Sequence, residues 1–257
     1  MTYCVGILLD AGIVFASDSR TNAGVDQVSN YSKMRIFERP GDRFITILSS
    51  GNLSLTQNAI NMLEQKGRHH EDAKFWGLQS MFEVANLLGE NLREVLKRDG
   101  PYLQQNNIDA SASFIVGGQI GDEAMRMFLV YAAGNFIEAT PETPFFQIGE
   151  TKYGKPIIDR VIKPESTLME AVKCTLVSFD STMRSNVSVG LPIDLVWYER
   201  ATLRVGLRRR ITESDPYFSM IHMQWGEGLR KVFSLLPDPT WDSPEVLSLQ
   251  QQAQIFK

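Results

Sequence analysis

The sequence has few cysteines, no long apolar run and no basic excess. Its 257 residues include two cysteines, Cys4 and Cys174, too few for a disulfide framework and typical of a reducing compartment such as the cytoplasm. No apolar stretch approaches the ~20 residues of a membrane span. The net charge of −4 argues against nucleic-acid binding, which usually requires basic residues. These absences predict a cytoplasmic protein with neither nucleic acid nor membrane as a partner.

Targeting and metal signals are also missing. The start, MTYCVGILLDAG, has no basic segment before an apolar one, so we expect no signal peptide. The adjacent His69 and His70 cannot share a helix face, so we expect a polar loop there. We therefore predict neither a metal site nor a cofactor.

The composition is that of a folded domain, with 43% hydrophobic and 22% charged residues. Short apolar runs with turn residues between them predict strands, and apolar positions at helical spacing predict helices. Asp99-Gly100-Pro101 predicts the end of the second helix. The expected strands are 3–9, 13–17, 34–37, 43–49, 112–118, 126–132, 135–139, 193–199 and 202–207, and the expected helices are 53–66, 74–98, 151–160 and 165–180.

The order of these elements predicts a layered α+β fold. Runs of antiparallel strands alternate with two helix pairs, and each pair needs a sheet face to cover. A four-layer αββα sandwich satisfies both pairs, although the pattern alone leaves other α+β arrangements open. We assign residues 2–210 to this domain.

We expect residues 211–257 to form a C-terminal extension, because their sequence pattern differs from that of the domain. An amphipathic helix is expected near 216–234, followed by an irregular tail. The extension carries Trp225 and Trp241, whose rings need a surface to pack on. A neighbouring subunit and the flank of the domain itself are equally good candidates.

The second residue offers a nucleophile. Removal of Met1 exposes Thr2, which then carries a hydroxyl and a free α-amine on one residue. An α-amine titrates near pH 7.7–8.0, so it is a usable base at neutral pH. Threonine paired with its own amine is a known activated nucleophile. Many proteins begin with Met-Thr, so the dipeptide alone is weak evidence.

Two neighbouring features strengthen this interpretation. The hairpin of 3–9 and 13–17 returns Asp18 beside Thr2, and Lys33 enters the next strand. A positive charge near an amine lowers its pKa and favours the basic form, although an ordinary ion pair at a strand end would look the same. The segment Ser49-Ser50-Gly51-Asn52 joins a strand to a helix, where a free N–H can stabilise an oxyanion. A plain turn is the alternative there.

Together, Thr2, FASDSR, the lysine of SKMRIF and LSSGN resemble the proteasome β-subunit family, and within it the bacterial branch called Anbu. The resemblance is strongest over residues 2–60 and extends to about 205. It implies an N-terminal-nucleophile hydrolase fold, a homo-oligomeric ring or open spiral, and threonine peptidase activity on peptides. By position, Thr2 is the nucleophile, Asp18 and Lys33 tune it, and Gly51 N–H forms the oxyanion hole.

The sequence departs from the family pattern at three places. Gly149-Glu150-Thr151 replaces a Gly-Ser-Gly, and Arg184-Ser185-Asn186 lacks an aspartate, although Ser185 and Ser188 can keep part of its hydrogen-bonding role. The extension beyond 211 is absent from the β subunits and suits the Anbu branch. The first two departures put catalytic efficiency in doubt and leave the fold prediction intact.

The resemblance also implies a pocket for the residue before the cleaved bond. Strand alternation places Tyr31, Lys33 and Arg35 on one face. Arg35 indicates an acidic or polar preference, or else it faces solvent or a neighbouring subunit. The implied lining residues are Thr21, Tyr31, Arg35, Ser49 and Leu53.

Three functions remain in competition. The leading one is an active threonine peptidase assembled from copies of this chain. The second is an assembly subunit that has lost most catalysis, and the third is an amidase acting on a small peptide-like metabolite. No segment identifies an ATP-driven unfoldase as a partner.

Overall fold

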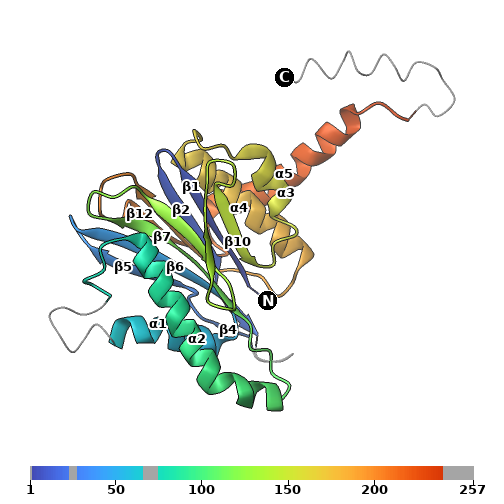
Figure 1. The fold of residues 1–257 in the computed structure, drawn as a ribbon. Helices are drawn as coiled ribbons and strands as arrows, with labels where there is room; N and C mark the ends of the chain where they lie inside the picture. The colour runs from blue at the N-terminus through green and yellow to red at the C-terminus, as the bar shows by residue number, and fades with distance from the viewer. Residues whose placement is uncertain (1, 23–27, 66–74, 240–257) are drawn as a thin grey trace.

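The computed structural model describes residues 2–22, 28–65 and 75–239, which form two stacked five-stranded antiparallel sheets with helices on their outer faces (Figure 1). The helices are α1 (Leu53–Gln65), α2 (Met81–Gln105), α3 (Lys155–Val161), α4 (Leu168–Ser185) and α5 (Pro216–Leu235). The strands are β1 (Tyr3–Leu9), β2 (Gly12–Asp18), β3 (Arg20–Asn22), β4 (Val28–Asn30), β5 (Met34–Arg39), β6 (Arg43–Gly51), β7 (Ala112–Ile120), β8 (Arg126–Val130), β9 (Phe136–Glu138), β10 (Phe145–Gly149), β11 (Ile193–Glu199) and β12 (Leu207–Ile211).

The first sheet has the strand order β10-β1-β2-β11-β12, and the second has β5-β6-β7-β8-β9. Odd residues of β1 such as Val5 and Ile7 pack outward against α3 and α4, whereas Cys4 faces the second sheet. The helices α1 and α2 cover the far side of the second sheet. The four layers therefore enclose three apolar clusters, and the predicted αββα sandwich is confirmed.

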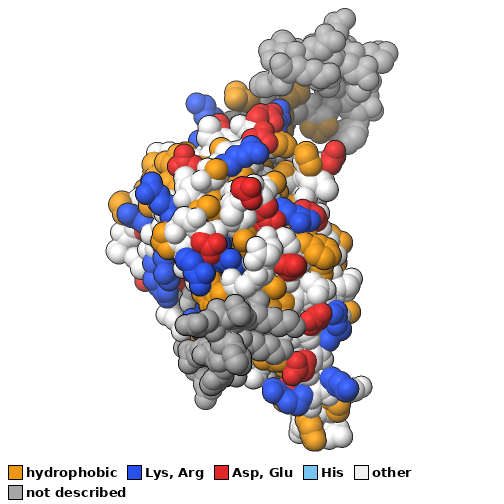
Figure 2. Space-filling model, turned by 60° about the vertical axis from the view of Figure 1, so that its left-hand side comes forward, with side chains coloured by type: hydrophobic (Ala, Val, Ile, Leu, Met, Phe, Trp, Pro, Cys, Tyr) orange, Lys and Arg blue, Asp and Glu red, His pale blue; other side chains and the backbone are white. Residues whose placement is uncertain are grey.

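Charged residues lie mainly on the outside. Figure 2 shows acidic and basic side chains interspersed over one face of the molecule. Among the described residues, none of the helices combines the length and apolar character needed to cross a bilayer.

The predicted end of α2 is wrong. The helix begins at Met81, capped by the Ser80 hydroxyl, and continues through Pro101 to Gln105. Proline removes one helical hydrogen bond. Leu96 and Leu103 lie against the apolar cluster under α2, and this packing extends the helix beyond its local stop signal.

Two strands of the first sheet differ from the prediction. The sequence does not predict β10. This strand lies at the edge of the first sheet and pairs with β1 from Tyr3↔Gly149 to Ile7↔Phe145. The last strand lies at 207–211 instead of 202–207, because Ala201 and Leu203 adopt positive φ angles in the connection. Arg208 to Arg210 therefore belong to this edge strand.

The extension helix α5 matches its predicted range and has two unlike halves. Phe218 and Ile221 are buried in the cluster under α4, and Trp225 packs partly against it. His222 contacts Asp180 of α4 at 2.6 Å. In the second half Val232 and Phe233 are 62% and 76% exposed, and Figure 1 shows this half projecting from the body. Trp241 and the tail from 240 onward lie outside the described residues.

This asymmetry predicts different effects for two substitutions in the same helix. Phe218→Ala should lower the free energy of unfolding by about 3–5 kcal/mol, because it opens a cavity between α5 and α4. Phe233→Ala should change it by less than about 0.5 kcal/mol, because the ring is exposed. Urea unfolding of the monomeric chain measures both free energies. Equal losses in the two variants would contradict the finding that only the first half of α5 packs against the domain.

Candidate active site

Thr2 is fixed by the residues on both sides of it. Its carbonyl oxygen accepts a hydrogen bond of 2.7 Å from Glu150 N, immediately after β10. The amide of the next residue, Tyr3, donates to Asp18 Oδ1 at 2.9 Å. Gly149 has a φ of +85°, and a side chain there would collide with the Thr2 carbonyl. The start of β1 therefore has little freedom to shift.

Asp18 and Lys33 form a buried ion pair beside Thr2. Lys33 Nζ lies 2.8 Å from Asp18 Oδ1, and the two side chains are 7% and 0% exposed. Nζ also donates to the carbonyl of Arg20 at 2.7 Å. Burial raises the pKa of the Asp18 carboxyl, while the Lys33 ammonium and the Tyr3 N–H act in the opposite direction. The pair thus places one fixed cation near the N-terminal residue.

Gly51 directs its amide away from the sheet. In an antiparallel strand, alternate residues send their N–H groups to opposite neighbours. Ser49 N donates to Lys33 O on the β5 side, and Asn52 N donates to Ser111 O on the β7 side. Gly51 N–H therefore points to the β5 side, beyond the start of β5 at Met34. Its φ of +101° favours glycine.

Thr2, Lys33 and Gly51 border one cleft of about 540 Å³. It lies where β6 gives way to α1, and it receives Thr2 from one sheet and Lys33 and Gly51 from the other. Of the six residues predicted to be catalytic, Thr2, Lys33 and Gly51 line the cleft, and Asp18 is joined to them through its ion pair with Lys33. The cleft is lined by Thr2, Arg20, Lys33, Ser49, Ser50, Gly51, Asn52, Leu53, Ser54, Thr56, Ile108, Asp109 and Gly149.

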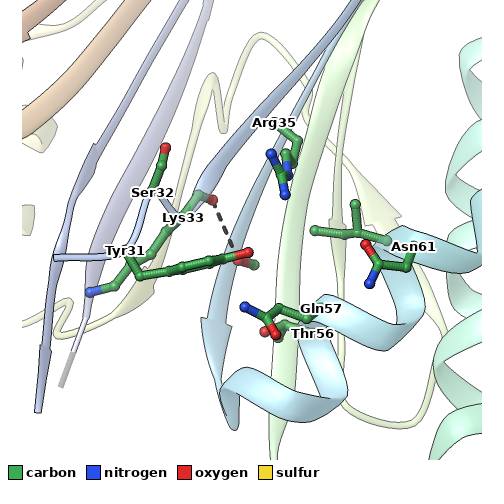
Figure 3. Close-up of a pocket in the computed structure, with 9 residues that line it drawn as sticks. Tyr31, Ser32, Lys33, Arg35, Thr56, Gln57 and Asn61 are labelled. Atoms are coloured by element: carbon green, nitrogen blue, oxygen red, sulfur yellow. Dashed lines mark hydrogen bonds between the residues drawn. The ribbon is translucent and has the colours of Figure 1, made fainter. Parts of the chain in front are cut away.

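A narrow side pocket adjoins the cleft and shares Lys33, Ser49 and Thr56 with it. In Figure 3 the Lys33 amine points away from this pocket, whereas the Arg35 and Asn61 side chains converge on it. Four of the five predicted substrate residues therefore meet here: Tyr31, Arg35 and Ser49 line the pocket and Leu53 lines the cleft. Thr21 belongs to β3, and its side chain lies outside the described part of the structure.

Ser185 and Ser188 are not among the residues that line the cleft. Ser185 is exposed at the end of α4, and Ser188 N donates to the side chain of Asn186. Their catalytic role stays a prediction.

In the same segments the structure brings Glu150 to Thr2, and Asn186 to Glu150. Glu150 binds the Thr2 carbonyl through its amide, and its carboxylate accepts a hydrogen bond from Asn186 Nδ2 at 2.9 Å. The sequence identifies both positions only as departures from the family pattern. The charged residue directly after Gly149 is the signal that the sequence offers.

Other reactive groups nearby are poor competitors for the nucleophile. Burial and the Asp18 charge raise the pKa of the Cys4 thiol well above its usual range, so it stays protonated. Burial likewise raises the pKa of Cys174 to about 12. Within the described residues, no three His, Cys, Asp or Glu side chains are arranged to hold a metal ion.

Comparisons with a family model and with a curated relative both point to the proteasome family. A family model described as proteasome subunit matches residues 2–198. The proteasome subunit beta of Methanopyrus kandleri is 25% identical over 199 residues, which cover 77% of this chain and 87% of the relative.

Solved structures agree over nearly the whole chain. Anbu (ancestral beta-subunit) from Yersinia bercovieri is 47% identical, with a TM-score of 0.87 over 93% of this chain and 99% of that one. The structure described as the helical assembly of the Anbu complex from Pseudomonas aeruginosa is 45% identical, with a TM-score of 0.87 over 93% and 98% of the two chains. The predicted resemblance to the proteasome β subunits and to Anbu proteins is confirmed.

The buried ion pair predicts a specific stability pattern. Lys33→Met leaves the Asp18 carboxylate buried without its cation and should cost about 3–5 kcal/mol at pH 7. Loss of the Lys33 cation raises the folded-state pKa of Asp18 further above its unfolded-state pKa. The loss of stability should therefore grow as pH rises from the unfolded-state pKa to the folded-state pKa, and it should shrink toward pH 4. Urea unfolding at pH 4 and pH 7 measures this difference.

The double variant Asp18→Asn/Lys33→Met removes both charges and serves as the control. It should regain part of the loss and show a weaker dependence on pH. A Lys33→Met variant with wild-type stability at pH 7 would contradict the burial of the pair.

Proposed function

Because this chain belongs to the proteasome subunit family, we propose that it is a threonine-type peptidase whose nucleophile is Thr2 after removal of Met1. The observation that carries this proposal is the convergence of Thr2, the Asp18–Lys33 pair and the outward Gly51 amide on one cleft. These residues come from two sheets, so their meeting is a property of the fold rather than of local sequence.

In the proposed reaction the Thr2 hydroxyl attacks the carbonyl carbon of a peptide bond. The freed α-amine accepts the hydroxyl proton, directly or through a water molecule, and later donates a proton to the departing amine. The negative oxygen of the tetrahedral intermediate is stabilised by Gly51 N–H. A water molecule then hydrolyses the Thr2 ester and regenerates the enzyme.

Lys33 and Asp18 act as a fixed pair in this mechanism. A cation near the α-amine lowers the amine's pKa and favours its basic form. The hydrogen bond from Tyr3 N to Asp18 ties the strand that carries Thr2 to the same carboxylate. The pair thereby sets both the electrostatics and the position of the nucleophile.

The side pocket favours a very small side chain, polar where it has a polar group, in the residue before the cleaved bond. Its volume is only about 10 Å³, which leaves room for little more than a water molecule. Polar groups of Arg35, Gln57 and Asn61 surround it, and Arg35 supplies a positive charge.

Two alternatives share the same fold. An assembly subunit of low activity is favoured by two observations: Glu150 lies beside Thr2, and Ser185 and Ser188 do not line the cleft. A small-molecule amidase would use the same nucleophile. Peptides of increasing length separate the amidase from the peptidase, because only a peptidase keeps or gains turnover with longer chains.

The nucleophile is tested by intact mass measured before and after treatment with an epoxyketone or a β-lactone directed at N-terminal threonine. We expect loss of the Met1 mass and then one stoichiometric adduct, because the amine and hydroxyl of Thr2 react together with the epoxyketone. The Thr2→Ala variant should acquire no adduct. Retained Met1, or a free Thr2 that never reacts, would reject the peptidase and favour the assembly subunit.

We also propose that copies of this chain associate through α5, and that residues 211–257 form an assembly extension of the domain 2–210. Leu229, Val232, Phe233 and Leu236 lie at helical spacing on one face and are each more than half exposed. An apolar face of this kind usually marks an interface. The Pseudomonas aeruginosa relative forms a helical assembly, which supports self-association.

The cysteine content of the chain supports a cytoplasmic location.

This interface can be tested with matched charge insertions. Phe233→Glu should lower the apparent affinity between copies at least tenfold in sedimentation velocity, because it buries a charge in an apolar contact. Ser234→Glu adds the same charge at the neighbouring exposed position, on another side of the helix, and should change association much less. Equal behaviour of the two variants would exclude this face.

A further inference from the structure

Two carboxylates, not one, flank the N-terminal residue. Asp18 lies on the β2 side of Thr2, and Glu150 lies on the β10 side. The register that pairs Tyr3 with Gly149 continues to Thr2 opposite Glu150, and the 2.7 Å bond from Glu150 N to Thr2 O closes this pair. The mechanism above uses Asp18 and leaves Glu150 without a role.

The hydrogen bond from Glu150 N to Thr2 O places the backbones of these two residues side by side at the end of the ladder. Opposed residues of an antiparallel pair have Cα atoms ~4.5–5.5 Å apart, and the α-amine of Thr2 is bonded to its Cα. A freed α-amine at this position lies within a few ångströms of the start of the Glu150 side chain.

The Glu150 carboxylate is held in place by neutral partners. Asn186 Nδ2 donates to Oε2 at 2.9 Å, and Lys152 N lies 3.3 Å from Oε1. Glu150 and Asn186 are only 8% and 9% exposed, so water screens the charge poorly. Neither of these partners carries a charge that would neutralise the carboxylate.

The other charged groups around Thr2 are already engaged. Lys33 is paired with Asp18 at 2.8 Å. Arg20 lines the cleft and donates to the Val187 carbonyl, and Asp109 lines it with its carboxylate bound by Ser111. Glu150, in contrast, is hydrogen-bonded to Thr2 through its backbone amide, and its carboxylate has only uncharged partners.

We propose that the Glu150 carboxylate, held by Asn186, keeps the freed α-amine of Thr2 in its ammonium form and so restrains the nucleophile at neutral pH. A negative charge beside an amine raises its pKa, opposite in sign to the effect of Lys33. The ammonium cannot accept the hydroxyl proton, so attack by Thr2 accelerates as pH rises through the amine's pKa. This inference rests on the proposed nucleophile, and Glu150 is a positioning residue in it.

The test is a titration of the α-amine itself. Competitive acetylation with acetic anhydride is run on the full chain from pH 5 to pH 10, and mass spectrometry of the N-terminal peptide gives the extent of reaction. In Glu150→Gln, which keeps the shape and removes the charge, the midpoint should fall by about one pH unit. The rate of epoxyketone labelling at pH 7 should rise about tenfold in the same variant.

Two further variants make the result specific. Asp109→Asn removes a carboxylate that lines the cleft and should move the amine midpoint much less than Glu150→Gln does. Asn186→Ala keeps the Glu150 charge but frees the side chain, and should lower the midpoint by a smaller amount. This variant also serves if Glu150→Gln does not fold.

The outcomes separate this inference from the proposed function. An unchanged midpoint in Glu150→Gln, or an equal shift in Asp109→Asn, overturns the role of Glu150 whatever the labelling shows. Loss of labelling at every pH with an unchanged midpoint would instead make Glu150 the base. A shifted midpoint without labelling in any variant supports the charge effect and rejects the peptidase, whereas retained Met1 contradicts both.

Discussion

The ion pair between Asp18 and Lys33 joins the two sheets at the point where the chain begins. Asp18 ends β2 in the first sheet, and Lys33 precedes β5 in the second. Both side chains are almost fully buried, so each charge would be costly without the other. Such a pair leaves little freedom in the relative position of the sheets. The cleft exists because this constraint brings Thr2 of one sheet next to Gly51 of the other.

The same carboxylate also orients the strand that begins after Thr2, the proposed nucleophile. Asp18 Oδ1 accepts from both Lys33 Nζ and Tyr3 N, so one oxygen connects the cation to the backbone beside Thr2. On the opposite side, Glu150 N holds the Thr2 carbonyl. Pre-positioned reacting groups remove part of the entropic barrier to attack. The site is therefore built from backbone geometry as much as from reactive side chains.

Local sequence predicted those parts of the site that depend on local structure. The β1–β2 hairpin alone brings Asp18 to the start of β1, because a turn at Asp10-Ala11 fixes the register. The resemblance to a family supplied Lys33 and Gly51, which reach Thr2 only through the stacking of two sheets. The continuation of α2 through Pro101 depends on apolar packing that outweighs a local stop signal. The sequence shows Glu150 only as the loss of a family serine, because its contact with Thr2 follows from the edge strand β10, which the pattern does not predict.

The carboxylates of Asp18 and Glu150 affect Thr2 differently, because only Asp18 is paired with a cation. Asp18 is neutralised by Lys33, so its main effect on Thr2 is positional. Glu150 is held by neutral hydrogen-bond donors, so its charge acts on whatever cation lies nearby. The only group of Thr2 that can become cationic is its α-amine, and that group must be neutral for the hydroxyl to be activated. In the proposed mechanism, a fold that positions the nucleophile correctly can therefore still restrain it, because different residues set the position of the reacting atoms and the protonation state of the base.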